Sequence, residues 1–82
     1  MKILYFAWIK DKTGKSYEYI DSSKVKDIKA LKKFLKDKYP DLVNFINQKQ
    51  VLRFAVNFEY TKKNNKLSKK DEVAIFPPVS GG

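Results

Sequence analysis

The part of this 82-residue chain with distinctive chemistry is its end, Pro77-Pro78-Val79-Ser80-Gly81-Gly82. Two glycines let a backbone pass through a channel too narrow for a Cβ atom. The prolines hold the chain extended, which reduces the entropy lost on binding. A terminal carboxylate is unreactive as it stands, but it becomes an acyl donor once a nucleotide is attached. We therefore favour a functional tail with Gly82 as its reactive residue over a frayed terminus, which is what most chain ends are.

The remaining side chains offer little chemistry of their own. The sequence has no cysteine and no histidine. This excludes a disulfide scaffold, a thiolate nucleophile, a zinc site built from cysteine and histidine, and a histidine-based triad. We expect no bound metal, and we expect that the chain is not an enzyme on its own.

The charge of the chain points to a partner. Eighteen basic and nine acidic residues give a net charge of +9. Excess basic charge can indicate nucleic-acid binding, but Arg53 is the only arginine, and arginine is the usual reader of phosphates and base edges. We expect no nucleic-acid partner, and favour an acidic protein whose encounter the charge accelerates.

No apolar run approaches the roughly twenty residues that span a bilayer. The apolar N-terminal segment, residues 1–9, lacks a convincing cleavage site and runs directly into a turn, so it is read as a strand rather than a signal peptide. No membrane association and a cytoplasmic location are the expectations that follow.

The pattern of apolar residues predicts the elements that hold the tail. Strands are expected at residues 1–9, 17–20, 51–58, 59–62 and 73–76, with a hairpin turn at 11–14. Val25, Ile28, Leu31 and Leu35 have helical spacing from Lys24 onward, and Tyr39-Pro40 ends that helix. Asp21-Ser22-Ser23 offers N-cap residues for it, and residues 41–48 predict a short helical turn capped by Asp41.

The order β-β-α-(turn)-β-β-β fits a mixed sheet with one main amphipathic helix across one face. The first and last strands are strongly apolar, so they are expected side by side in parallel at its centre. This α+β arrangement is the ubiquitin-like β-grasp. We predict a β-grasp domain at 1–76 and an extended C-terminal tail at 77–82.

The segment 71–82, together with Leu4-Tyr5-Phe6-Ala7, Val56-Asn57 and Leu67, resembles the small sulfur-carrier subunit of molybdopterin synthase, the MoaD family. The resemblance spans the chain and implies the same β-grasp fold. One departure is Lys70, which stands where the family usually has a glycine, so the left-handed turn expected there is in doubt.

The resemblance also implies a function. A MoeB-like activating enzyme would use ATP to place AMP on Gly82, with no cofactor bound by this chain. Sulfur would then displace AMP to give a thiocarboxylate. In a heterotetramer with a MoaE-like large subunit, the tail residues Pro77, Pro78, Val79, Ser80 and Gly81 would enter the partner's active site, and Gly82 would donate sulfur to cyclic pyranopterin monophosphate (precursor Z) in molybdenum cofactor biosynthesis.

Docking on the large subunit needs an exposed surface. Phe6, Trp8 and Phe76 share a strand face opposite the predicted helix, and Tyr60 corresponds to an apolar interface position in the family. The alternative for Phe6 and Phe76 is a second small core. Alternative functions are a sulfur carrier for thiamine thiazole synthesis and a ubiquitin-like protein modifier.

Overall fold

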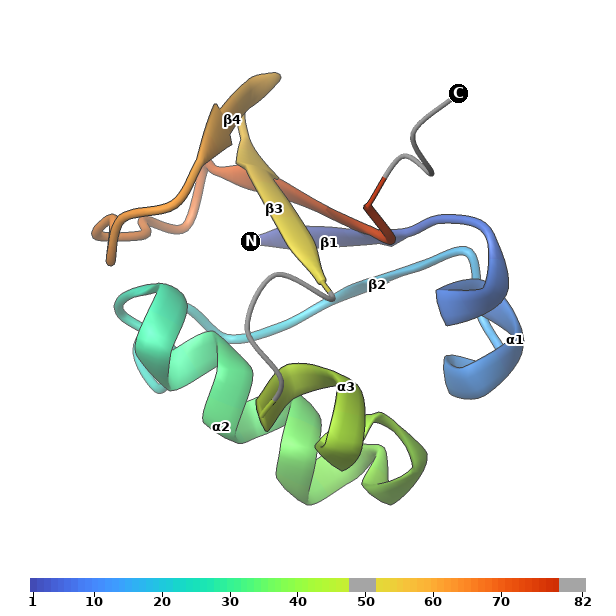
Figure 1. Ribbon diagram of the computed structural model, residues 1–82. Helices are drawn as coiled ribbons and strands as arrows, with labels where there is room; N and C mark the ends of the chain where they lie inside the picture. Colours follow the sequence, from blue (N-terminus) through green and yellow to red (C-terminus); the bar gives the residue numbers. More distant parts are fainter. Residues whose placement is uncertain (48–51, 79–82) are drawn as a thin grey trace.

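The computed structural model describes residues 1–47 and 52–78 (Figure 1). Its elements, in order, are β1 (Lys2–Tyr5), α1 (Trp8–Thr13), β2 (Tyr17–Tyr19), α2 (Ile28–Lys38), the 3-10 helix η1 (Pro40–Leu42), α3 (Val43–Asn47), β3 (Arg53–Val56), β4 (Glu59–Thr61) and β5 (Glu72–Phe76). The strands form one mixed sheet in the order β2-β1-β5-β3-β4.

The first and last strands lie side by side at the centre of this sheet, as predicted. β1 and β5 run parallel with Ile3 opposite Val73 and Tyr5 opposite Ile75, and all four side chains are buried. β3 pairs antiparallel with the other side of β5. The strand that leads into the C-terminal tail is therefore hydrogen-bonded on both sides.

Helix α2 crosses one face of the sheet, with α3 beside it on the same side (Figure 1). Its apolar stripe, Ile28, Leu31 and Leu35, is buried, and its lysines form the outer surface. The helix begins later than predicted, because Asp27 is its N-cap and accepts from the backbone N of Ala30 at 2.7 Å. Asp21-Ser22-Ser23 instead forms a local turn, and Asp41 caps nothing in η1.

The strand predicted at residues 1–9 is correct in its first half and wrong in its second half, which leads into a helix. β1 ends at Tyr5, and the chain bends at Ala7, whose φ is 55°, into α1. Ile9 and Thr13, one helical turn apart, are the buried residues of α1. Gly14, at φ 76°, ends the helix in the left-handed conformation instead of closing a β-hairpin.

The β3–β4 connection is a two-residue loop, Asn57-Phe58, in which both residues have positive φ, as a type I′ hairpin requires. The side chain of Asn57 donates to Asp71 at 2.8 Å and accepts from the backbone N of Glu72 at 2.9 Å. The bond from Asn57 holds the pKa of Asp71 below its ordinary value. These contacts fix the hairpin against the start of β5.

The turn before β5 does not use a left-handed residue at Lys70. The backbone N of Asp71 donates to the carbonyl of Ser68 at 3.0 Å, and the Asp71 carboxylate accepts from the Ser68 backbone N at 2.7 Å. The positive-φ residues of the described chain lie elsewhere. The doubt that Lys70 raised is therefore resolved by an ordinary turn, and Leu67 is buried just before it.

A buried carboxylate joins the helix to the sheet. Glu18 on β2 accepts hydrogen bonds from Tyr5 Oη at 2.5 Å, from Lys38 Nζ at 2.6 Å, and from Tyr39 Oη. Its side chain is only 8% exposed. Burial alone would raise the pKa of Glu18, but these three donors outweigh it and lower that pKa. The ionised carboxylate therefore stabilises the contact between β1, β2 and the end of α2.

Nothing in residues 1–47 or 52–78 forms a helix long and apolar enough to cross a bilayer.

We predict that Glu18→Gln lowers the free energy of unfolding by ~2 kcal/mol near neutral pH, because it removes charge-assisted hydrogen bonds from three donors. A lowered carboxylate pKa contributes stability above its unfolded-state value, and that contribution is lost as pH falls through the folded-state pKa. Urea unfolding of both proteins across the acid range should therefore show the difference shrinking with falling pH. Glu59→Gln, at an exposed glutamate of β4, is the control. A difference that did not change with pH would contradict the account.

Candidate functional site

The face of the sheet opposite the helices meets the tail at the end of β5. Phe6 directly follows β1, and its backbone N still donates to the carbonyl of Ile75 on β5, at 3.1 Å. On the other side of β5, Arg53 is directly opposite Phe76. Because side chains alternate along a strand, Phe6 and Phe76 point away from the buried Tyr5 and Ile75. Both phenylalanines therefore lie on the outer face, as predicted.

Tyr60 completes this cluster from the edge strand β4. Its ring centroid lies 6.4 Å from that of Phe76, with the two planes tilted by 47°. Arg53 Nη1 donates to Tyr60 Oη at 2.5 Å, and the guanidinium lies 5.7 Å from the ring centre. Arg53 thus fixes the position of Tyr60 beside Phe76. We call Phe6, Arg53, Tyr60 and Phe76 the docking face.

The docking face exposes apolar surface within the part of the chain that the structure describes. Phe6 is 47% exposed and Tyr60 is 50% exposed, while Phe76 is half-buried between them. This excludes the alternative of a second small core for Phe6. Aromatic side chains beside an arginine are the residue types that contribute most to binding at protein interfaces. The arrangement is suited to holding a partner protein at the base of the tail.

The face continues across the whole sheet. One row of opposed residues runs through all five strands, in the order Tyr17, Leu4, Ala74, Ala55 and Tyr60. The small alanines at its centre leave the face flat between the aromatic residues at its edges. A partner surface can therefore approach β5 closely from this side.

Trp8 does not belong to this face, which corrects the prediction made from strand alternation. It lies in α1, where its ring packs 4.7 Å from that of Phe45 on α3. The error follows from extending β1 past Tyr5. Trp8 contributes to the contact between two helices instead.

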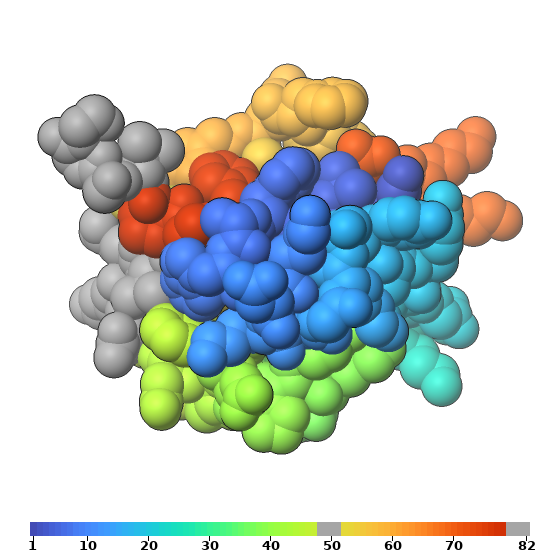
Figure 2. All heavy atoms as spheres, turned by 90° about the vertical axis from the view of Figure 1, so that its right-hand side faces the viewer, coloured from blue at the N-terminus to red at the C-terminus, as the bar shows by residue number. Residues whose placement is uncertain are grey.

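The tail begins at the docking face. β5 ends at Phe76, and Pro77 and Pro78 follow without secondary structure, both half-buried. Figure 2 shows the last described residues, in red, at the surface and directly against the blue N-terminal segment. The predicted tail residues Val79, Ser80, Gly81 and Gly82 lie outside the described residues.

Sequence reasoning missed Arg53 as a site residue. Its signal was present, since it is the only arginine of the chain and alternates with the core residues Leu52 and Phe54. The docking face brings together no pair of titratable groups suited to acid–base catalysis. What it offers is an anchoring surface beside an exit for the chain.

Comparison with known proteins shows the family to which the chain belongs. The sequence matches the model of the ThiS family over residues 3–82. The chain belongs to the ThiS family. The match includes both the strands of the sheet and the C-terminal tail.

Within the ThiS family, the curated relatives confirm the resemblance found in the sequence. The molybdopterin synthase sulfur carrier subunit of Dictyostelium discoideum is 38% identical over 88 residues, covering 99% of this chain and 94% of that protein. The molybdopterin synthase sulfur carrier subunit of Homo sapiens is 37% identical over 87 residues, covering 100% of this chain and 93% of the human protein.

A solved structure confirms the fold. SAMP1 from Haloferax volcanii aligns with a TM-score of 0.80 at 23% identity, covering 100% of this chain and 98% of that one. Together with the strand order and the helix across one face, this likeness confirms the predicted ubiquitin-like β-grasp.

Proposed function

We propose that this chain is the sulfur-carrier subunit of a molybdopterin synthase, and that Gly82 is the residue that carries the sulfur. Full-length similarity to molybdopterin synthase sulfur carrier subunits supports this assignment. The single structural observation that carries it is the position of β5. The last strand is the central strand of the sheet, and it passes the chain to Pro77-Pro78 beside an uncovered aromatic face.

Loading of the tail takes two steps. In the first, a carboxylate oxygen of Gly82 attacks the α-phosphorus of ATP on a MoeB-like activating enzyme, and pyrophosphate leaves. The product is a mixed anhydride of glycine and AMP, whose carbonyl carbon is now electrophilic. In the second, hydrosulfide or another donor sulfur at the sulfide oxidation level attacks that carbon and AMP leaves, so Gly82 becomes a thiocarboxylate with no change of oxidation state. AMP is transient, and this chain binds no cofactor.

Delivery takes place in the large subunit, which is of the MoaE kind. The thiocarboxylate sulfur attacks a carbon of cyclic pyranopterin monophosphate as one carbon–oxygen bond at that carbon breaks, and the displaced oxygen leaves as water or as a protonated hydroxyl. The bond from sulfur to the Gly82 carbonyl carbon then breaks with the addition of water, which restores the carboxylate. Two deliveries build a dithiolene, which is consistent with a heterotetramer carrying two copies of each subunit.

The chain's own contribution is positioning. The docking face anchors the scaffold, and Pro77 and Pro78 limit the conformations available to the arm beyond it. Gly81 and Gly82 present no Cβ to a narrow channel. Acid–base catalysis is left to the large subunit, because this chain has neither cysteine nor histidine. The expected cytoplasmic location stays a prediction.

Deleting Gly82, or replacing Gly81 with Trp, should abolish molybdopterin formation in a synthase reconstituted with the activating enzyme, a sulfur donor and ATP. The deletion displaces the reacting carboxylate by one residue, and the tryptophan blocks a channel shaped for glycine. Ser80→Ala is the matched control, because it keeps the length and the final two glycines. Unfolding curves should be unchanged in all three variants. Molybdopterin formed by either tail variant at the wild-type rate would overturn the proposal.

The same tail variants separate the proposal from a ubiquitin-like modifier. Incubation of the wild-type chain with ATP and lysate should give no ladder of covalent conjugates. A ladder that disappears on deletion of Gly82 would instead support protein modification. Restoration of thiazole synthesis, but not of molybdopterin, by the wild-type chain in carrier-deficient extracts would support the thiamine alternative.

Phe6→Ala should weaken binding of the large subunit by about tenfold or more, because buried aromatic anchors contribute on the order of 2 kcal/mol at interfaces. Phe58→Ala is the matched control. Phe58 is 92% exposed but lies at the tip of the β3–β4 hairpin, near the start rather than the end of β5. Titration calorimetry measures both. Equal losses in the two variants would contradict the docking face as defined here.

A further inference from the structure

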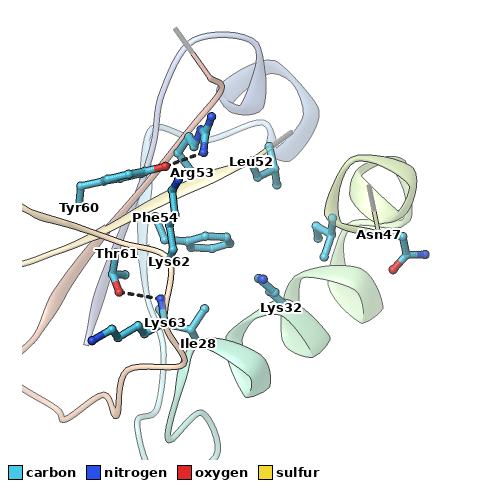
Figure 3. Close-up of a pocket in the computed structure, with 11 residues that line it drawn as sticks. Ile28, Lys32, Asn47, Leu52, Arg53, Phe54, Tyr60, Thr61, Lys62 and Lys63 are labelled. Atoms are coloured by element: carbon cyan, nitrogen blue, oxygen red, sulfur yellow. Dashed lines mark hydrogen bonds between the residues drawn. The ribbon is translucent and has the colours of Figure 1, made fainter. Parts of the chain in front are cut away.

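A second surface lies away from the tail, between the helices and the β4 edge of the sheet. Here α2, α3 and the β3–β4 hairpin enclose a cleft of about 410 Å³ (Figure 3). Its floor is apolar. Ile28 of α2, Phe54 of β3 and Leu52, which directly precedes β3, form this floor. An apolar side chain of a ligand has a place to bury against this floor.

The rim of the cleft is basic. Lys32 of α2 lines the cleft on the helix side, and Lys62 and Lys63, which directly follow β4, line it on the sheet side. Lys32 Nζ lies 5.5 Å from the centre of the Phe54 ring, so its charge sits directly above the floor. The described residues that line the cleft include no aspartate or glutamate.

These rim charges are not neutralised within the described part of the chain. The ion pairs found there join Lys33 to Asp37, and Lys15 and Lys38 to Glu18, and none includes a rim lysine. Lys29 and Lys36 add further basic charge along α2, on a surface that also includes Asp27 and the paired Lys33. Three ammonium groups around one opening create a positive potential that attracts a negatively charged ligand.

We propose that this cleft binds an acidic, extended segment of a partner protein, with one apolar side chain on the floor and carboxylates between the rim lysines. The charge complementarity and the apolar floor together select this occupant. A nucleic-acid backbone would match the rim but leave the floor in contact with water. Arg53, the residue best suited to phosphate, already donates to Tyr60.

The position of the cleft favours the same occupant. β4 is an edge strand of the sheet, with β3 as its one neighbour among the described strands. An extended segment can therefore lie along it, as in strand addition to an exposed edge. Tyr60 lines both this cleft and the docking face. A protein held on the docking face can reach the cleft with a segment of its own chain.

The test titrates a model peptide, acetyl-Glu-Asp-Leu-Glu-Asp-amide, into the isotopically labelled full chain. Binding is followed by the NMR signals of the backbone amides. We expect saturable shifts of Ile28, Lys32 and Lys63, and a loss of affinity of about tenfold in Lys62→Glu/Lys63→Glu, because two attractive charges become repulsive. Lys69→Glu/Lys70→Glu is the control. It reverses the same number of charges in another lysine pair, in the turn before β5, which does not line the cleft.

Three outcomes would overturn the assignment. Equal losses in the two double variants would mean that the peptide responds only to net charge. If a peptide with Ser in place of Leu bound as tightly as the original peptide, the apolar floor would have no role in binding. Tighter binding of an oligothymidylate than of the peptide would make the cleft a nucleic-acid site. None of these measurements involves Gly82, so their failure leaves the proposed sulfur-carrier function standing.

Discussion

The parallel pairing of β1 with β5 is the contact on which the rest of the structure depends. It places the last strand of the chain in the middle of the sheet, where β3 binds its other edge. The inner residues of the pair, Ile3, Tyr5, Val73 and Ile75, are the part of the sheet that α2 covers. Its outer residues, Phe6 and Phe76, are left beside the point where the tail begins. Pairing on both sides stabilises the strand that leads into the tail.

The two faces of the sheet differ in burial and composition. The helix-covered face contains the core and the buried Glu18, whose three donors come from β1, α2 and the residue after α2. The outer face has a row of tyrosine, leucine and alanine residues, and none of the described helices lies over it (Figure 1). The lysines at the rim of the cleft lie on α2 and directly after β4. The docking face and the basic cleft therefore meet at Tyr60 but lie on different parts of the surface, and the core residues between the sheet and α2 stay buried.

Much of this architecture follows from local pattern. The spacing of Ile28, Leu31 and Leu35 predicts α2 and its buried stripe, and the apolar first and last strands predict their central pairing. The N-terminal error has a physical reason. Residues 5–9 are apolar on both alternating faces, so the pattern does not show where the strand ends. Ile9 and Thr13 at helical spacing, with Gly14 after them, were the available signal for α1.

Other features depend on contacts between distant residues. Asp27 caps α2 although three earlier residues are good caps, because the bridge from Asp27 to Lys66 fixes where the helix begins. The sequence predicted Phe6, Tyr60 and Phe76 for the outer face together with Trp8, which lies in α1 instead. Arg53 enters the face only through the register of β3 with β5 and β4. The basic cleft requires α2 and the hairpin to be brought together, so the sequence shows its lysines but not their arrangement.

We propose above all that this scaffold presents Gly82 for loading with sulfur. Intact-mass measurement of the chain produced together with its activating enzyme and a sulfur donor tests it most directly. The account predicts a species heavier by the difference between one sulfur and one oxygen, located on the C-terminal peptide and absent when ATP is withheld. A chain that stays at its unmodified mass under conditions that load a known carrier would contradict it.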